Sequence, residues 1–224
     1  EEAFALKING VLSDLSAPID SDASIDFINF NSNEGKQVYW HSSVHLLAQA
    51  FLRLYQDAKN GMGPAVDGGF YQDFAVQNFS SDDLKKIEKE MDKIIHEKLP
   101  VVRMEVEISE AKKYFTNNKY KLEILSDLMN AGEKSVTLYK QGEFIDICRG
   151  PHVPNTYAIK AVKLLKVAGA YWKGDAKLDQ LTRVYGISFP DKKLLQDFVT
   201  MQEEAEKRDH RKIGKELDLF TLHD

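Results

Sequence analysis

Two short motifs contain the side chains best suited to chemistry. The run HSSVH places His41 and His45 four residues apart, a spacing that puts both imidazoles on one face of a helix. The run CRGPH follows an apolar segment, and its Gly-Pro step predicts a turn that points Cys148 and His152 at a common spot. Together the two motifs offer three imidazoles and one thiol.

These four side chains fit more than one kind of site. Zn²⁺ binds histidine nitrogen at about 2.0–2.1 Å and cysteine sulfur at about 2.3 Å, so a tetrahedral zinc site is one interpretation. Neutral imidazole is also the usual proton acceptor near pH 7, which suits water activation without a metal. A nucleophilic cysteine is a third interpretation, although the sequence shows no residue that would orient it. Structural histidines and a buried structural thiol are the plain alternatives.

Two charged residues are further candidates. Asp146 precedes Cys148 by two positions, which places both on one face of a strand, where the carboxylate can bind an ammonium group or cap a turn. Lys121, in the run YKLE, can supply a fixed cation, but the pattern alone favours a solvated lysine on a helix.

Lysines and aromatic residues gather between positions 160 and 173. This combination is typical of surfaces that bind single-stranded RNA, whose phosphates attract cations and whose bases stack on rings. Lysines on the wet face of a strand give the same pattern. The residues concerned are Lys160, Lys163, Lys166, Tyr171, Trp172 and Lys173.

The composition is that of a globular protein. The chain has 224 residues, a formal net charge of −5 and a mean hydropathy of −0.40, which exclude disordered and fibrous classes. No apolar run approaches the ~18–20 residues needed to cross a bilayer, and no secretory signal is expected from the first residues given. The single cysteine, Cys148, favours a reducing compartment, so a cytoplasmic location is expected.

Hydrophobic periodicity predicts an α+β fold, with an antiparallel sheet packed against long helices. Strands are expected around the Asn9-Gly10 turn and at 25–30, 102–108, 136–140, 143–147, 159–168 and 182–188. Helices are expected at 40–57, 82–99, 110–116 and 190–217. The runs NEG at 33–35 and DGG at 67–69 are expected turns.

Several runs of this sequence resemble the N-terminal editing region of bacterial-type threonyl-tRNA synthetases. They are WHSSVHLLA at 40–48, Gly63-Pro64, GFYQD at 69–73, DICRGPHVP at 146–154 and KVAGAYWKGD at 166–175. The run KRDHRKIGKELDL at 207–219 resembles the helix that leads into the catalytic domain of that family.

The resemblance implies four parts along the chain. Residues 1–31 would be part of a ubiquitin-like β-grasp module, and residues 32–189 the editing domain. Residues 190–212 would form a linker helix, and residues 213–224 would begin a class II catalytic domain. ATP, Mg and Zn are expected only in the remainder of such a synthetase, which would also form its homodimer.

The resemblance further implies hydrolysis of seryl-tRNA(Thr), a mischarged product, by water at the aminoacyl ester of the 3′ acceptor end. His41 would lie near the ribose hydroxyl and the water, with Lys121 as its partner in activating that water. Cys148 and His152 would complete the catalytic pocket. Backbone N–H groups near Gly63 or Cys148 would bind the oxyanion.

The same resemblance implies residues that bind substrate. His45 would orient its neighbours, Asp146 would hold the substrate ammonium, and Gly63, Tyr71 and Gln72 would line the pocket. Gln72 departs from the family, in which an aromatic residue is more often expected. The residues expected to contact tRNA are Arg149, Lys163, Lys166, Tyr171, Trp172 and Lys173.

No metal or other cofactor is expected in the editing site, because the threonyl branch of the family looks metal-independent there. Two alternatives stay open at this point. One is a zinc-dependent editing hydrolase of the alanyl type, and the other is a non-catalytic module that binds tRNA.

Overall fold

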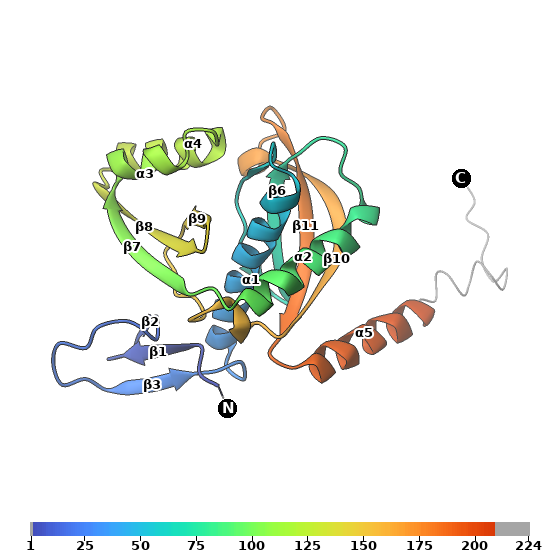
Figure 1. Cartoon of the computed structure of the whole chain (residues 1–224), viewed down its shortest axis with the longest axis horizontal. Helices are drawn as coiled ribbons and strands as arrows, with labels where there is room; N and C mark the ends of the chain where they lie inside the picture. The colour runs from blue at the N-terminus through green and yellow to red at the C-terminus, as the bar shows by residue number, and fades with distance from the viewer. Residues whose placement is uncertain (1, 209–224) are drawn as a thin grey trace, which may run out of the picture.

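Three antiparallel sheets and five α-helices build the part of the chain that the structure describes, residues 2–208 of a computed structural model (Figure 1). The predicted α+β class is therefore confirmed. The division into four modules stays a prediction, and its last part, 213–224, lies outside the described residues.

A small N-terminal sheet has the strand order β2-β1-β3, with β1 at Ala5–Ile8, β2 at Val11–Ser13 and β3 at Ile25–Ile28. The Asn9-Gly10 hairpin is confirmed, with φ values of 51° and 82° that suit a type I′ turn. Phe4 packs its ring on Tyr39 at 4.9 Å between centroids. This sheet therefore shares a hydrophobic core with the first long helix.

The helix that carries His41 and His45 is α1, Asn33–Leu54. It begins seven residues earlier than predicted, because 33–35 forms its first turn and is not a separate turn. Ser32 is the N-cap, and its hydroxyl accepts the N–H of Gly35 at 3.0 Å. Gly35 also lies against the carbonyl of Asn29. The early start matters because it gives the two histidines nearly two helical turns of support.

The central sheet has the strand order β10-β11-β6-β4, with β5 paired to β6. Helix α1 packs on β6 and β11, and α2 packs on β10 and on α1, so both helices cover one face (Figure 1). Phe51 of α1 stacks on Phe74 of β6 at 3.7 Å between ring centroids. The bounds are β4 Lys59–Asn60, β5 Ala65–Val66, β6 Gly69–Ala75, β10 Ala161–Tyr171, β11 Gln180–Phe189 and α2 Leu84–Glu97.

The third sheet, in the order β7-β8-β9, carries its own small core. Strands β7 (Val101–Glu107), β8 (Ser135–Gln141) and β9 (Phe144–Ile147) confirm the predicted strand and hairpin. Helices α3 (Ile108–Tyr114) and α4 (Lys119–Asn130) follow β7, and α4 was not among the expected elements. Side chains from α3, α4 and β8 make this core.

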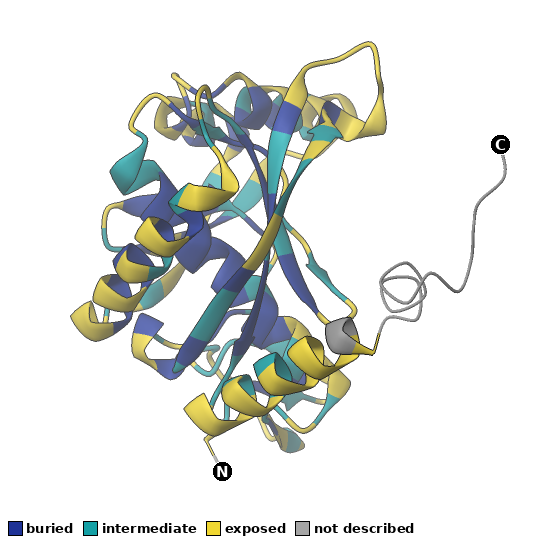
Figure 2. Cartoon of the chain, turned by 90° about the vertical axis from the view of Figure 1, so that its right-hand side faces the viewer, coloured by how far each residue is buried: buried dark blue, intermediate teal, exposed yellow. Residues whose placement is uncertain are grey.

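The last described helix is α5, Lys192–Lys207, which lies along the outside of the molecule and is largely exposed (Figure 2). It confirms the start of the predicted helix at 190–217, whose end lies outside the described residues. Short 3-10 turns occupy Ser81–Asp83, Thr156–Ala158 and Trp172–Gly174. None of the helices described is long and apolar enough to cross a membrane.

The start of α1 gives a first test. A Cβ added at Gly35 would lie 1.7 Å from the carbonyl oxygen of Asn29. We expect Gly35→Ala to lower the free energy of unfolding by about 1–3 kcal/mol, although alanine normally favours a helix by about 1 kcal/mol over glycine. Urea unfolding measures this. Lys36→Ala is the control, and a stabilised Gly35→Ala variant would contradict the packing described.

Candidate active site

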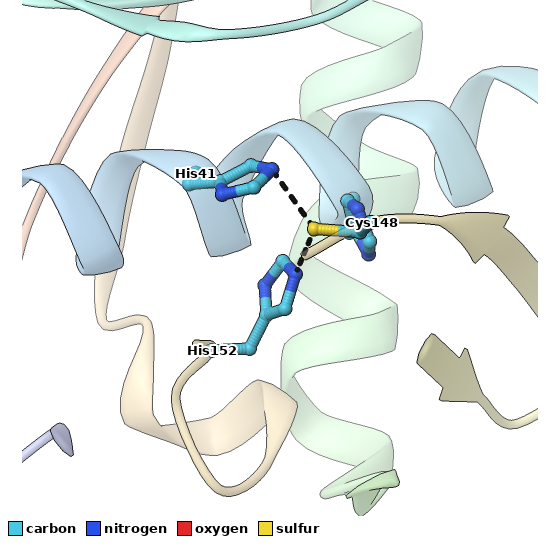
Figure 3. Close-up of side chains that lie close together, drawn as sticks. His41, Cys148 and His152 are labelled. Atoms are coloured by element: carbon cyan, nitrogen blue, oxygen red, sulfur yellow. Dashed lines mark hydrogen bonds between the residues drawn. The ribbon is translucent and has the colours of Figure 1, made fainter. Parts of the chain in front are cut away.

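Three separate elements bring the predicted residues together. His41 and His45 lie on α1, Cys148 follows the end of β9, and His152 closes the turn after it (Figure 3). The Sγ atom of Cys148 lies 3.3 Å from Nε2 of His41 and 3.1 Å from Nε2 of His152. One donor atom from each of the four residues lies within 4.8 Å of the other three. The two motifs therefore form one cluster.

The turn between Cys148 and His152 is held at several points. Its Gly150-Pro151 peptide is cis, and Gly150 has a φ of 70°, with a Cβ position only 1.9 Å from the hydroxyl of Tyr139. Only glycine fits there. The carboxylate of Asp14 accepts the N–H of His152 at 2.9 Å and the hydroxyl of Tyr139 at 2.7 Å. The segment after the N-terminal sheet therefore helps to place His152.

A single serine on α1 fixes the ring of His152. The hydroxyl of Ser42 donates to the carbonyl of Val38 at 2.8 Å, and it accepts the N–H of Val153 at 3.0 Å. Its one proton is thus used, so Nδ1 of His152, 3.1 Å away, must donate to it. The Nε2 atom of His152 is then unprotonated and faces the thiol of Cys148.

Burial keeps this cluster uncharged. Desolvation, with a smaller effect from Lys121, lowers the pKa of His41 from 6.5 to about 4. Desolvation and the neighbouring imidazoles hold the pKa values of His45 and His152 well below 6.5. Desolvation also raises the pKa of the Cys148 thiol to about 12. At neutral pH the cluster therefore consists of neutral imidazoles and a protonated thiol.

Lys121 lies at the buried start of α4 and is not a solvated lysine. Its ammonium pairs with Asp146 at 2.6 Å, with both side chains 5% exposed. Asp146 also accepts from the amide of Asn60 at 2.9 Å, and Asn60 accepts from Asn118 at 3.0 Å. Asn118 closes the ring because its side chain accepts the N–H groups of Tyr120 and Lys121. This network fixes the lysine in one place.

The expected role of Asp146 changes with this geometry. One carboxylate oxygen lies 2.6 Å from the ammonium of Lys121 and accepts the backbone N–H of Ile147 at 2.8 Å. The other oxygen accepts from the side-chain amide of Asn60. Burial raises the pKa of Asp146, and these partners counter that rise. The carboxylate is thus committed to holding Lys121. A substrate ammonium would have to share it with a cation already in place.

The cluster opens into a cavity of about 470 Å³. His41, Lys121 and Cys148 line it together with Gly63 and Gln72. The N–H of Gly63 has no acceptor within residues 2–208, so it is available to an oxyanion. The N–H of Cys148 is not available, since it donates to the carbonyl of Thr137 at 3.1 Å. Arg149 is exposed where the turn borders the same cavity.

Tyr71 is the predicted substrate-binding residue that the structure places elsewhere. It alternates with Gln72 along β6, so the two side chains point to opposite faces of the sheet. The ring of Tyr71 packs under the guanidinium of Arg183 at 3.8 Å and beside Tyr185 at 5.7 Å. The expectation that Tyr71 lines the pocket was wrong, because the strand register turns it away.

The predicted RNA-contacting stretch is only partly free. Trp172 is 3% exposed, packs on Tyr120 and donates to Glu123 at 3.0 Å. Its ring is therefore part of a core, and the expectation that it stacks on RNA bases was wrong. Lys173 pairs with Glu123 at 2.6 Å and with Asp127.

The rest of the stretch lies along β10. Lys163 pairs with Glu88 at 3.1 Å, and the ammonium of Lys166 lies over the ring of Tyr185 at 4.9 Å. Tyr171 is 45% exposed. Of the residues proposed to bind RNA, Tyr171, Lys166 and Arg149 are exposed and form no ion pair within residues 2–208.

Four site residues were missed by sequence reasoning: Ser42, Asp14, Asn60 and Asn118. Ser42 lies inside the HSSVH run, so its position between the two histidines could have marked it as a candidate site residue. The other three come from distant segments. No local pattern marks them, because their roles arise only where those segments meet.

The four donor atoms also suit a zinc ion by type. Among the described residues, Nδ1 of His45 is the buried polar side-chain atom without a partner, which a metal or a ligand would satisfy. Tetrahedral zinc with these ligands would need donor atoms about 3.4–3.8 Å apart. The four donor atoms lie up to 4.8 Å apart, so their side chains would have to move closer together to bind an ion.

Comparison with known proteins defines the class first. Residues 136–185 match the family described as "Threonyl and Alanyl tRNA synthetase second additional domain". This segment runs from the second residue of β8 through β9, the Cys148–His152 turn and β10 into β11. This stretch of the chain is therefore similar to the additional domain of these tRNA synthetases.

Particular relatives extend the likeness to the whole chain. It is 48% identical over 225 residues to a threonine--tRNA ligase of Caldanaerobacter subterraneus, covering 99% of the chain and 35% of the relative. It is 49% identical over 223 residues to the threonine--tRNA ligase of Cytophaga hutchinsonii, covering 98% of the chain and 34% of that relative. It is also 49% identical over 222 residues to the threonine--tRNA ligase of Staphylococcus aureus, covering 99% of the chain and 34% of that relative. The chain spans about a third of the length of these relatives, and the resemblance seen in its motifs is confirmed.

The uncharged histidines predict how stability changes with pH. A histidine whose pKa is lowered on folding binds its proton more readily in the unfolded chain, so acid favours unfolding. Stability should fall as pH drops from 6.5 toward 4, with up to about 1.4 kcal/mol per pH unit from each of these histidines. Urea unfolding at several pH values measures this slope. His45→Phe should reduce the slope by about one histidine, and equal slopes in the native chain and this variant would contradict the assignment.

The placement of Trp172 gives a matched pair of variants. Because its ring is buried, Trp172→Ala should lower the free energy of unfolding by about 3–5 kcal/mol. Tyr171→Ala, at the exposed neighbouring position, should change it by no more than about 0.5 kcal/mol. Urea unfolding compares the two. A small effect at both positions would mean that the tryptophan ring is not part of the core.

Proposed function

We propose that this chain is the editing module of a threonine--tRNA ligase and that it hydrolyses seryl-tRNA(Thr) at the aminoacyl ester. The observation that carries the proposal is the neutral His41–Cys148–His152 cluster, which opens with Lys121 into one cavity. The whole-chain similarity to threonine--tRNA ligases supports the choice of substrate.

The chemistry of the ligase reaction explains the need for such a module. Serine is threonine without one methyl group, and a pocket that accepts the larger side chain discriminates against the smaller by only ~1–3 kcal/mol. A second site can reject threonine if its pocket has no room for the methyl group. The tight contact of Gly63 with Gln72 and Val44 at the cavity wall offers such a restriction.

Water is a better candidate than Cys148 for the nucleophile. A thiol with a pKa of about 12 is almost entirely protonated at neutral pH, and only the thiolate attacks efficiently. Neutral His41 can accept hydrogen bonds from water and orient it. The ammonium of Lys121, fixed by Asp146, supplies positive charge to the oxyanion, and the N–H of Gly63 can donate to it as well.

The partner in this proposal is the 3′ acceptor end of tRNA(Thr) carrying serine. Exposed Arg149 at the edge of the cavity is placed to meet its phosphates. We further propose that aminoacylation with ATP, Mg and Zn, and formation of a homodimer, belong to the remainder of the ligase, and that the protein acts in the cytoplasm. No metal is proposed for the editing reaction.

A zinc-dependent hydrolase of the alanyl type is the second candidate. The unpartnered Nδ1 of His45 and the His₃Cys donor set favour it. In that case residues of this set would hold the ion with one coordination position left open for water, and the ion would lower the pKa of that water. The wide spread of the donor atoms makes this the weaker of the two proposals.

The test is deacylation of purified seryl-tRNA(Thr) by the chain. We expect hydrolysis by the native chain and a loss of about 10²-fold or more in His41→Ala and in Cys148→Ala, since each removes a group from the cluster. His96→Ala, on the exposed face of α2, is the matched control and should be as fast as the native chain. Threonyl-tRNA(Thr) should be spared.

Three outcomes would decide against parts of the proposal. Equal rates in the native chain and both site variants would place the chemistry elsewhere and favour a non-catalytic module that binds tRNA. Rapid loss of threonine would contradict a sieve based on the methyl group. Metal analysis of the active chain completes the test: about one tightly held zinc per chain, with activity lost on its removal, would favour the alanyl type.

A further inference from the structure

The side-chain amide of Gln72 has only one possible orientation. Its nitrogen lies 3.1 Å from the carbonyl oxygen of Met62 and 3.0 Å from that of Asp73. Both partners are acceptors, so the NH₂ group must face them and spends both of its protons there. The carbonyl oxygen, Oε1, is therefore the free end of this amide.

The Oε1 atom of Gln72 lies in the wall of the cavity. A Cβ added at Gly63 would meet it at 2.2 Å and would meet the side chain of Val44 at 2.5 Å. Val44 stands between the two histidines on α1. Within residues 2–208 no donor reaches Oε1, and Gln72 is one of the residues that line the cavity. An acceptor held without a donor is costly unless a ligand or water supplies one.

We propose that Oε1 of Gln72 accepts a hydrogen bond from the hydroxyl of the aminoacyl side chain, so that Gln72 determines specificity for a hydroxyl-bearing substrate. The inference rests on the proposed function and assigns it a selecting residue. A neutral carbonyl suits a neutral hydroxyl donor. The substrate ammonium, by contrast, is a cation, and it would share the carboxylate of Asp146 in the same cavity with Lys121.

The same contact would also exclude threonine. A hydroxyl bonded at about 2.7–2.8 Å to Oε1 places the carbon that bears it close to the wall formed by Gly63 and Val44. Threonine carries its additional methyl on that same carbon. Selection of the hydroxyl and exclusion of the methyl group would therefore happen at one place.

The experiment measures binding of two probes to the full chain. They are non-hydrolysable adenosines that carry serine or alanine through a 3′-amide, and their dissociation constants are measured by calorimetry. In the native chain we expect the seryl probe to bind about threefold to tenfold more tightly than the alanyl probe, the range of one neutral hydrogen bond. In Gln72→Met, which keeps the length but has no acceptor of this kind, the two probes should bind equally within about twofold.

The ratio of the two probes separates a selecting role from a structural one. General damage to the cavity would weaken both probes and leave their ratio unchanged, which would overturn the inference. Tyr71→Phe, the neighbour on the opposite face, is the matched control and should keep the native ratio. Equal binding of both probes by the native chain, or failure to bind either, would also overturn it.

The deacylation assay distinguishes this inference from the proposed function. If the native chain hydrolyses seryl-tRNA(Thr) but Gln72→Met keeps the native probe ratio, the function stands and the role of Gln72 is wrong. If the native chain does not hydrolyse seryl-tRNA(Thr) but shows the expected ratio, and Gln72→Met loses it, the hydroxyl-binding role stands and the function is wrong.

Discussion

The contact between α1 and the turn that follows β9 governs the rest of the site. One hydroxyl, that of Ser42, bonds to Val38 on its own helix and to His152 and Val153 on the turn. This contact joins segments more than a hundred residues apart and selects the tautomer of His152. The lone pair that faces Cys148 follows from it, because an imidazole that donates through Nδ1 must accept through Nε2.

Burial decides which chemistry the cluster can perform. Imidazoles and a thiol taken from water keep their neutral forms, as the lowered and raised pKa values of His41 and Cys148 show. The charges of Lys121 and Asp146 lie beside them, buried as a pair and held by two asparagines. The site therefore combines neutral proton acceptors with one oriented cation. That combination suits attack by water better than attack by a thiolate.

Successive side chains of β6 point to opposite faces of the central sheet, so neighbouring residues lie in different environments. Gln72 faces α1 and the cavity, while Tyr71, one residue earlier, faces away and packs on Arg183. A register shift of one residue would exchange these two side chains. The pairing of β6 with β11, which sets Tyr71 opposite Tyr185, is thus as important to the cavity as the two motifs that form the cluster.

Sequence alone determined the α+β class, the two hairpins, most strands and the two motifs that meet in the cluster, because each depends on local periodicity, turn chemistry or residue type. It was wrong about the face of the sheet on which Tyr71 lies, the exposure of Trp172 and Lys121, and the residue at which α1 begins. Tertiary structure decided those, since a side chain's face and burial depend on the segments packed against it. Asp14, Asn60 and Asn118 carried no local signal at all. Their hydrogen bonds exist only because folding brings distant polar groups into a space where water cannot satisfy them.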